Sequence, residues 1–224
     1  MDESTNNSGW ISAAEFHRAP GVSDWRVMAT GPQAVFTATS LSQSADLIAP
    51  IVDAAEQFGI RPDVDVRPEA VVVRIPDRTM QGIPAAAVGF AAAVSLAAAE
   101  LALTPEPSLA QSMSIYVAQH SQADARPFFM AALGYEAFGD TDAVDPLRCG
   151  PPLAFNPITG DHPARGRTHL DIYVPADQVR ARVDAALAAG GRLADDSYAP
   201  AWWSLASPEN HGVDIAGWPD TRSG

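Results

Sequence analysis

The chain has 224 residues, 14 of them basic and 27 acidic, with a formal net charge of -13 at pH 7. All the basic residues are arginine, which excludes mechanisms that need a lysine amine, such as Schiff-base chemistry or a P-loop lysine. The negative charge argues against nucleic-acid phosphates and anionic lipid surfaces as partners, because both attract basic patches. We therefore expect a small-molecule ligand and neither a nucleic acid nor a membrane.

Cysteine usage and the first residues favour a cytoplasmic protein. The single cysteine, Cys149, cannot close an internal disulfide. The start, MDESTNNSGW, is acidic and polar, unlike the basic and apolar regions of a signal peptide. The most apolar stretch, residues 84–103, consists largely of alanine, which buries too little surface to favour a membrane span over a packed helix.

The first half of the chain predicts an α+β domain, residues 11–103, behind a disordered tail at residues 1–10. Ser12 and Glu15 have the spacing of a capping box, so a helix should begin at Ser12. Gly59 is a typical helix stop, and Pro50 inside the second predicted helix implies a kink or a late start. In chain order, the remaining predicted elements are strands at 25–29 and 34–39, a helix at 42–58, a strand at 64–75, and a helix at 84–103 with Pro84 in its first turn. This order predicts one antiparallel sheet backed by helices.

Two prolines, Pro105 and Pro107, predict an extended linker over residues 104–111. The second domain, residues 112–220, contains an internal repeat. Ile115-Tyr116-Val117 recurs 57 residues later as Ile172-Tyr173-Val174, and a second alanine-rich match keeps the same offset. The predicted elements are strand 112–118, helix 124–133 and strand 153–158 in one copy, and strand 168–174, helix 176–189 and strands 202–206 and 212–216 in the other. We infer paired βαβββ modules that curve one sheet face around a cavity.

The second domain resembles the vicinal oxygen chelate superfamily, which includes glyoxalase I, bleomycin-resistance proteins and extradiol dioxygenases. The resemblance rests on Arg167-Thr168-His169-Leu170-Asp171-Ile172, at the start of the second module, and on the segment 207–214, Ser-Pro-Glu-Asn-His-Gly-Val-Asp, near its end. In metal-dependent relatives, four inward positions hold metal ligands. The resemblance places these positions on Ser112, Asn156, His169 and Asp214.

The first domain is similar to the pterin-4a-carbinolamine dehydratase family. The shared landmarks are Ile11-Ser12 with Glu15-Phe16, then Trp25, and then Arg61-Pro62-Asp63, where the family has His-His-Pro-Asp. The resemblance implies a lyase that uses histidines as acid and base, but these positions hold Arg61 and Arg78, which cannot cycle a proton. The domain therefore either binds an anionic or acyl ligand through Arg61, Asp63 and Arg78, or serves as an interaction scaffold.

Strand alternation selects the candidate catalytic residues of the second domain. If Leu170, Ile172 and Val174 pack under a helix, the alternate residues His169, Asp171 and Tyr173 face the cavity, as does Asp214 on the last strand. His169 could act as a general base that a carboxylate orients, or it could be a satisfied buried histidine. Serine and an amide are poor metal ligands, so we predict no metal centre; His169 and Asp214 are the candidate ligands if one exists.

Adjacent Trp202 and Trp203 must point to opposite faces of their strand, so one ring should form a flat wall for a ligand. The predicted binding residues of this domain are Trp202, Trp203, Tyr173, Asn156 and Ser112. We expect metal-independent acid–base chemistry, of lyase or isomerase type, on a polar or aromatic metabolite. The alternatives are a non-catalytic ligand-binding or drug-sequestering protein and a residual 4a-hydroxytetrahydropterin dehydratase. Both families also imply a homo-oligomer.

Overall fold

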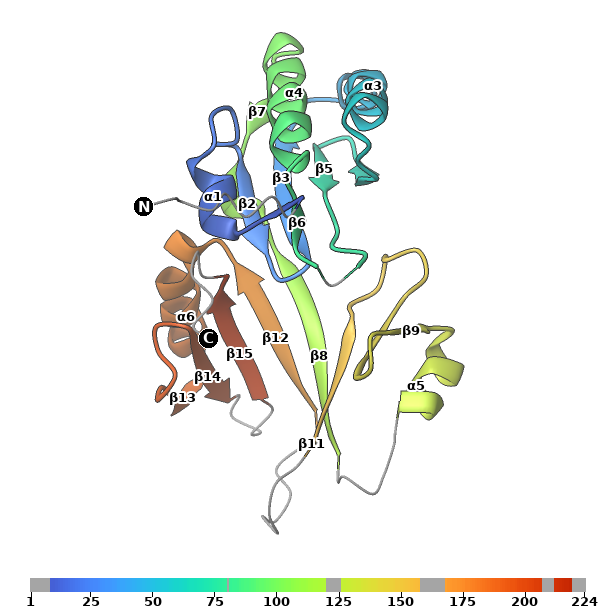
Figure 1. The fold of residues 1–224 in the computed structure, drawn as a ribbon. Helices are drawn as coiled ribbons and strands as arrows, with labels where there is room; N and C mark the ends of the chain where they lie inside the picture. The colour runs from blue at the N-terminus through green and yellow to red at the C-terminus, as the bar shows by residue number, and fades with distance from the viewer. Residues whose placement is uncertain (1–8, 80, 120–125, 158–167, 207–211, 219–224) are drawn as a thin grey trace, which may run out of the picture. The chain divides into compact units, whose positions relative to one another are not determined.

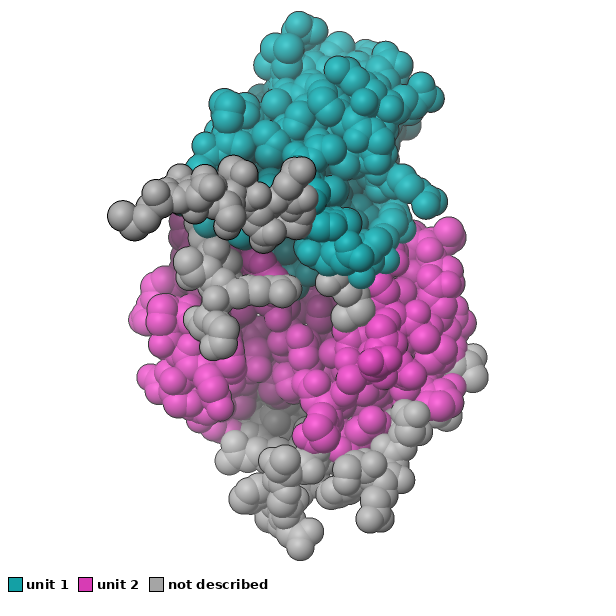
Figure 2. Space-filling model, in the orientation of Figure 1, with its two compact units in different colours: residues 1–110, 219–224 teal, residues 111–218 magenta. Residues whose placement is uncertain are grey.

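The computed structural model describes residues 9–79, 81–119, 126–157, 168–206 and 212–218 (Figure 1). The chain divides into two compact units, residues 1–110 with 219–224 and residues 111–218 (Figure 2). The division falls between Ala110 and Gln111, at the end of the predicted linker. Each unit is described by itself.

The sheet of the first unit is antiparallel, with strand order β2-β3-β5-β4, and β7 pairs with β3. A separate two-stranded ladder joins β1 to β6. The strands of this unit are β1 (Trp10–Ile11), β2 (Trp25–Met28), β3 (Gly31–Thr37), β4 (Asp63–Val66), β5 (Ala70–Arg74), β6 (Ile83–Pro84) and β7 (Thr104–Pro105). Its helices are α1 (Ala13–Arg18), α2 (Leu41–Asp46), α3 (Ile48–Phe58), α4 (Ala87–Glu100) and the 3-10 helix η1 (Pro107–Leu109).

Helices α3 and α4 pack side by side, and α4 covers the buried core of the sheet (Figure 1). Trp25 of β2 is fully buried, and its indole Nε1 donates to the carbonyl of Ala91 and the hydroxyl of Ser95, each at 3.2 Å. Its ring meets Phe90 edge to face. Trp25, which the sequence shares with the dehydratase family, therefore connects helix α4 to the sheet.

Two helix signals in the sequence act as predicted. The Ser12 and Glu15 side chains form the capping box, each satisfying a backbone N–H of the first turn of α1. Gly59 ends α3 in the left-handed conformation, with φ of 65°. Pro50 lies in the first turn of α3, because the single predicted helix divides at Leu47 into α2 and α3.

Four boundaries in the first unit were predicted wrongly. The strand expected over residues 64–75 is a hairpin of β4 and β5, in which the Arg67 N–H donates to the Ala70 carbonyl around Pro68. Pro84 belongs to β6, and α4 begins only at Ala87. Trp10, assigned to a disordered tail, pairs with Pro84 in β1. Residues 104–110 are no free linker, because β7 pairs with β3 and the Glu106 N–H donates to Val35.

The described part of the chain contains no helix that is long and apolar enough to cross a membrane.

The second unit is built on one eight-stranded sheet of order β13-β14-β15-β12-β8-β11-β10-β9. Its strands are β8 (Ser112–Gln119), β9 (Glu136–Phe138), β10 (Asp142–Val144), β11 (Leu153–Pro157), β12 (Thr168–Val174), β13 (Arg192–Asp195), β14 (Trp202–Ala206) and β15 (Gly212–Gly217). Strand, helix and three strands follow one another twice. The sequence prediction missed β9, β10 and β13, which have only three or four residues each.

The two copies of the repeat meet at the centre of this sheet. Strands β8 and β12 are antiparallel neighbours, and Asp171 lies opposite Ser114. Outside them, β11 runs parallel to β8 and β15 runs parallel to β12. Ser114 and Asp171 are also 57 residues apart, which is the offset of the repeat. The approximate twofold axis that relates the two copies therefore passes between these two residues.

Two helices cover the same face of the sheet, one on each flank (Figure 1). Helix α6 (Val179–Ala188), preceded by the 3-10 helix η2 (Ala176–Gln178), packs against β15 and β12. Helix α5 (Arg126–Leu133) packs against the strands of the first copy. The buried side chains of the two flanks are Val174, Val179, Val183, Leu205 and Ile215 beside α6, and Val117, Ala143, Leu153 and Phe155 beside α5.

Candidate functional site: the polar face of the second sheet

Alternation along the strands places most polar side chains of the second sheet on the face opposite its helices. Ile172 and Val174 of β12 pack in the α6 core, so His169, Asp171 and Tyr173 project to the other side, as the sequence predicts. Leu170, predicted to pack with them, is instead 39% exposed, because it lies beyond the part of β12 that α6 covers. Strand pairing brings further residues to that side. We call this surface the polar face; it comprises Ser112, Ser114, Tyr116, Asp142, His169, Asp171, Tyr173, Trp202, Ser204 and Asp214.

One imidazole and two carboxylates meet at the centre of the polar face. The Nε2 atom of His169 lies 3.0 Å from Oδ1 of Asp171 and 3.5 Å from Oδ2 of Asp214. The three side chains are partly buried, with 36%, 13% and 20% of their surfaces exposed. The arrangement follows from the register, because Asp171 of β12 is the direct neighbour of Asp214 in β15.

The environment changes the acidity of two groups in this cluster. The close contact with the Asp171 carboxylate raises the pKa of His169 above its ordinary value, against an opposing effect of burial. Burial raises the pKa of Asp214, although a hydrogen bond with the Ser204 side chain partly offsets it. Since an imidazole ordinarily titrates near neutrality, His169 is placed to hold or release a proton in the physiological range.

Two tyrosines border this cluster, one from each copy of the repeat. The ring of Tyr116 stacks on the imidazole of His169, with centroids 5.4 Å apart and planes 15° from parallel. Tyr173, its repeat counterpart 57 residues later in the sequence, lies on the same face of the sheet in β12. Burial raises the pKa of both phenols, so both remain neutral at physiological pH.

The tryptophan pair divides between the two faces, as predicted. Trp203 lies opposite Ile215 and packs in the α6 core, so it is no binding residue on the polar face. Trp202 lies on the polar side, where its ring stacks on Tyr198 at 4.3 Å. Directly after the end of β15, Trp218 meets Tyr173 edge to face, with centroids 5.9 Å apart.

Two of the predicted inward positions lie away from the cluster. Ser112 is opposite Tyr173, four residues along β8 from Tyr116, the residue opposite His169. Its hydroxyl oxygen is buried and has no hydrogen-bond partner. Asn156 is exposed and pairs with Ala118, beyond Tyr116 in the other direction. The four positions implied by the family resemblance therefore do not converge; Asp171 takes the third place beside His169 and Asp214.

The donor set of the cluster is compatible with a divalent cation. One ligand atom from each of His169, Asp171 and Asp214 lies within 4.8 Å of the other two. An imidazole nitrogen with two carboxylate oxygens suits several divalent metals. The sequence prediction of no metal counted only two strong donors, and the structure supplies a third. A metal bound here would act as a Lewis acid, and the same carboxylates can instead hold a protonated imidazole.

Two of the three predicted binding residues of the first unit, Arg78 and Asp63, form an ion pair, and the third, Arg61, takes no part in it. Arg78 donates to the Asp63 carboxylate, and both side chains are partly buried. Arg61 is exposed. The histidine of this unit, His17, accepts a hydrogen bond at Nε2 from the Val27 N–H, 3.2 Å away, so it is not merely a solvated surface residue. The similarity to pterin dehydratases stays a prediction for this unit.

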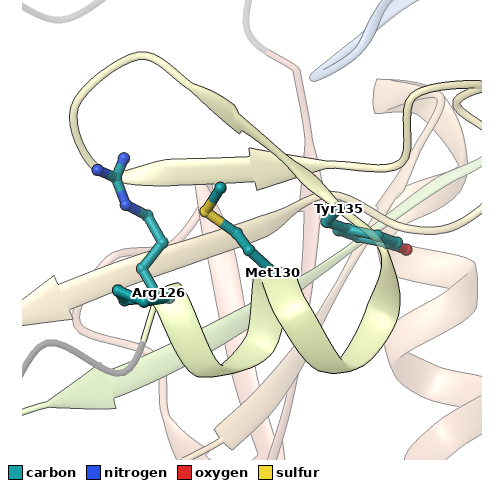
Figure 3. Close-up of a pocket in the computed structure, with 4 residues that line it drawn as sticks. Arg126, Met130 and Tyr135 are labelled. Carbon is teal, nitrogen blue, oxygen red and sulfur yellow. The ribbon is translucent and has the colours of Figure 1, made fainter.

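A hollow of about 460 Å³ lies elsewhere in the second unit, beside α5 (Figure 3). It is lined by Arg126, Pro127, Met130 and Tyr135. Neither a carboxylate nor an imidazole is among these residues, so the hollow offers no acid–base pair. We place the candidate site on the polar face because the interacting titratable groups are there.

The sequence analysis missed Tyr116, Ser114 and Ser204. Tyr116 could have been found, because it occupies the position of Tyr173 in the Ile-Tyr-Val repeat and must share its face. Ser114 could have been found in the same way, as the repeat partner of Asp171. Ser204 gave no signal, since its place opposite Asp214 depends on a strand register. His120, His162 and His211 lie outside the described residues.

The comparison with protein families agrees with the resemblance predicted for this unit. Residues 114–216 match the model of a family described as a glyoxalase-like domain. A solved glyoxalase/bleomycin resistance protein/dioxygenase superfamily member from Vibrio splendidus 12B01 is similar over 49% of this chain and all of its own length, at 14% identity and a TM-score of 0.32. No match was found among the curated proteins. Residues 114–216 are thus similar to glyoxalase-like domains, as the motifs around His169 and Asp214 predicted.

Proposed function

We propose that the second unit binds a small molecule on the polar face and that His169 moves a proton to or from it. The observation that carries this proposal is the position of His169, whose Nε2 lies 3.0 Å from Asp171 and 3.5 Å from Asp214. The match to a glyoxalase-like domain supports a small-molecule ligand and leaves the chemistry open. The reaction type that fits this arrangement is a lyase or isomerase step without a metal.

The proposed roles follow from the carboxylates around the imidazole. Asp171 Oδ1 lies 3.0 Å from Nε2, so the carboxylate favours a proton on that nitrogen and leaves the Nδ1 lone pair as the base. After Nδ1 takes a proton from the ligand, the two carboxylates stabilise the imidazolium. Asp171 is then a positioning residue for the base. Asp214, whose Oδ2 lies 3.5 Å from Nε2, is the second carboxylate that stabilises the imidazolium.

Proton abstraction next to a carbonyl begins many eliminations and isomerisations, so exchange with solvent deuterium tests this role. The probes are a panel of small enolisable aldehydes and ketones in D₂O, with deuterium incorporation followed by NMR. We expect exchange above the buffer rate for the wild type, lost in His169→Gln. Asp184→Asn is the control, because Asp184 pairs with Arg180 on the exposed surface of α6. Exchange that is unchanged in His169→Gln would contradict the catalytic role.

A non-catalytic binding protein is the second candidate. The stacked Tyr198 and Trp202 rings favour it, because they offer an aromatic surface beside the polar face and contribute no proton chemistry. This candidate predicts saturable binding of a probe on the polar face without deuterium exchange. His169→Gln would then change affinity alone.

A further inference from the structure

We propose that the natural ligand of the polar face is an organic cation: an ammonium group attached to an aromatic or apolar body. The inference rests on the proposed function, since it names the class of ligand for the same site. It depends on the charges that strand pairing brings to this face and on the rings that border them.

Carboxylates outnumber cations on the polar face and at its edge. Asp171 and Asp214 lie side by side on β12 and β15, and Asp142 reaches the same face from β10. Asp195 of the edge strand β13 lies opposite Ser204, on the same side as Asp214. The described residues on this side also include cations: His169, when protonated, Arg192 on β13 at the edge of the sheet, and Arg148, whose guanidinium lies over the ring of Phe138, opposite Asp142.

This surplus makes the centre of the face negative. His169 and its two carboxylate partners carry one negative charge together when the imidazole is protonated, and two when it is neutral. Burial is the largest cause of the raised pKa values of Tyr116 and Tyr173, and Asp171 and Asp214 add to it. An anionic ligand is repelled in such a place, while a cation is attracted and partly desolvated.

The aromatic rings distinguish an organic cation from a metal ion. Tyr116, Tyr173 and Trp218 form ring contacts along the face, and the two tyrosines stay neutral. Neutral rings of this kind stabilise an ammonium group through cation–π contact and pack against the body that carries it. A divalent ion bound to three oxygen and nitrogen donors gains nothing from these rings. Charge and aromatic contact together therefore favour the ammonium compound.

A matched set of three probes tests the charge preference: 2-phenylethylamine, 2-phenylethanol and phenylacetate, which share a phenyl ring and differ in charge. Binding to the full chain is followed by NMR shifts at constant ionic strength, with chelator present. We expect the amine to bind about tenfold more tightly than the alcohol, as a charged hydrogen bond predicts, and phenylacetate to bind most weakly. Equal affinities for amine and alcohol, or preference for phenylacetate, would overturn the proposal.

Variants assign the charge effect to individual carboxylates. Asp171→Asn and Asp214→Asn should each remove most of the advantage of the amine over the alcohol, while Asp184→Asn should leave it unchanged. Both are near-isosteric substitutions, and their NMR spectra report whether the fold is kept. An advantage that persists in both folded variants contradicts the assignment. An amine that binds only after added Zn²⁺ or Mn²⁺ shows that a metal occupies the cluster, which also overturns it.

The outcome separates this inference from the proposed function. If phenylacetate or the alcohol binds on the polar face and His169→Gln abolishes proton exchange, the proposed function holds and the charge preference fails. If the amine binds as expected and no exchange depends on His169, the ligand class holds and catalysis fails. If none of the three probes shifts residues of the polar face, the result counts against both.

Discussion

The ring of Tyr116 stacks on the imidazole of His169, with centroids 5.4 Å apart and planes 15° from parallel. The two residues lie directly opposite each other on the antiparallel neighbouring strands β8 and β12. Tyr116 therefore connects the first copy of the repeat to the imidazole of the site. Its repeat counterpart, Tyr173, lies 57 residues later and on the same face of the sheet.

Tyr173→Phe should raise the pKa of Tyr116, because the Tyr173 hydroxyl lowers that pKa against the larger effect of burial. The tyrosine absorbance titration measures the change. Tyr198→Phe is the control, since Tyr198 is 56% exposed and stacks on Trp202. An unchanged titration of Tyr116 in Tyr173→Phe would show that the two hydroxyls do not interact.

The contact between His169 and Asp171 predicts that the carboxylate raises the pKa of the imidazole. In wild type, the pKa of His169 should lie above the ordinary value near 6.5, and Asp171→Asn should lower it. NMR titration of the ring protons gives both values. A His169 pKa that is the same in the two proteins would contradict the geometry on which the proposed base depends.

The same shift fixes the sign of a stability change with pH. A group whose folded pKa is raised stabilises the fold at low pH, and the contribution is lost as pH rises through the folded pKa. For His169, the loss should occur above about pH 6.5, and it should be small because the side chain is 36% exposed. The raised pKa of Asp214 acts in the same direction at lower pH. The difference in unfolding free energy between wild type and His169→Gln, measured across this range, should shrink as pH increases.

The core beneath the polar face should be more sensitive than an exposed apolar position. Val183 of α6 is 1% exposed, and Val183→Ala should cost about 2 kcal/mol from the lost methyl groups and the remaining cavity. Val52 of α3 is 48% exposed, so Val52→Ala should change stability by less than about 0.5 kcal/mol. Denaturant unfolding compares them. Equal costs would contradict the packing of α6 on β12 and β15.

The first unit allows a direct test of the pterin alternative. Arg78 is paired with Asp63, and neither residue is an imidazole that could cycle a proton near neutrality. We expect no acceleration of 4a-hydroxytetrahydropterin dehydration above the buffer rate, measured by absorbance. Turnover that disappears in Asp63→Asn or Arg61→Gln would establish the residual dehydratase instead.

The site was partly predictable because strand periodicity determines which face a side chain occupies. Alternation along 168–174 correctly separated His169 and Asp171 from Ile172 and Val174, and adjacency alone separated Trp202 from Trp203. It was harder to predict which residues lie opposite one another on neighbouring strands, because this depends on the strand register. The sequence shows Asp171 and Asp214 far apart in the chain, and only the parallel pairing of β12 with β15 makes them neighbours.

The errors in the fold have local physical causes. The hairpin of β4 and β5 was read as one strand because its apolar residues continue on both sides of the turn at Pro68. Pro84 was placed in a helix because proline suits a first turn, but here its lack of an N–H is accommodated in the short ladder with β1. Strands β9, β10 and β13 are too short to show a periodic pattern.

The most direct test of the central claim is an NMR map of where 2-phenylethylamine and its uncharged and anionic analogues bind on the full-length protein. The account predicts ligand-dependent shifts at His169, Tyr116, Tyr173 and Trp218, weakened by Asp171→Asn and retained in Asp184→Asn. Shifts confined to the hollow beside α5, at Arg126, Met130 and Tyr135, or confined to the first unit, would contradict it.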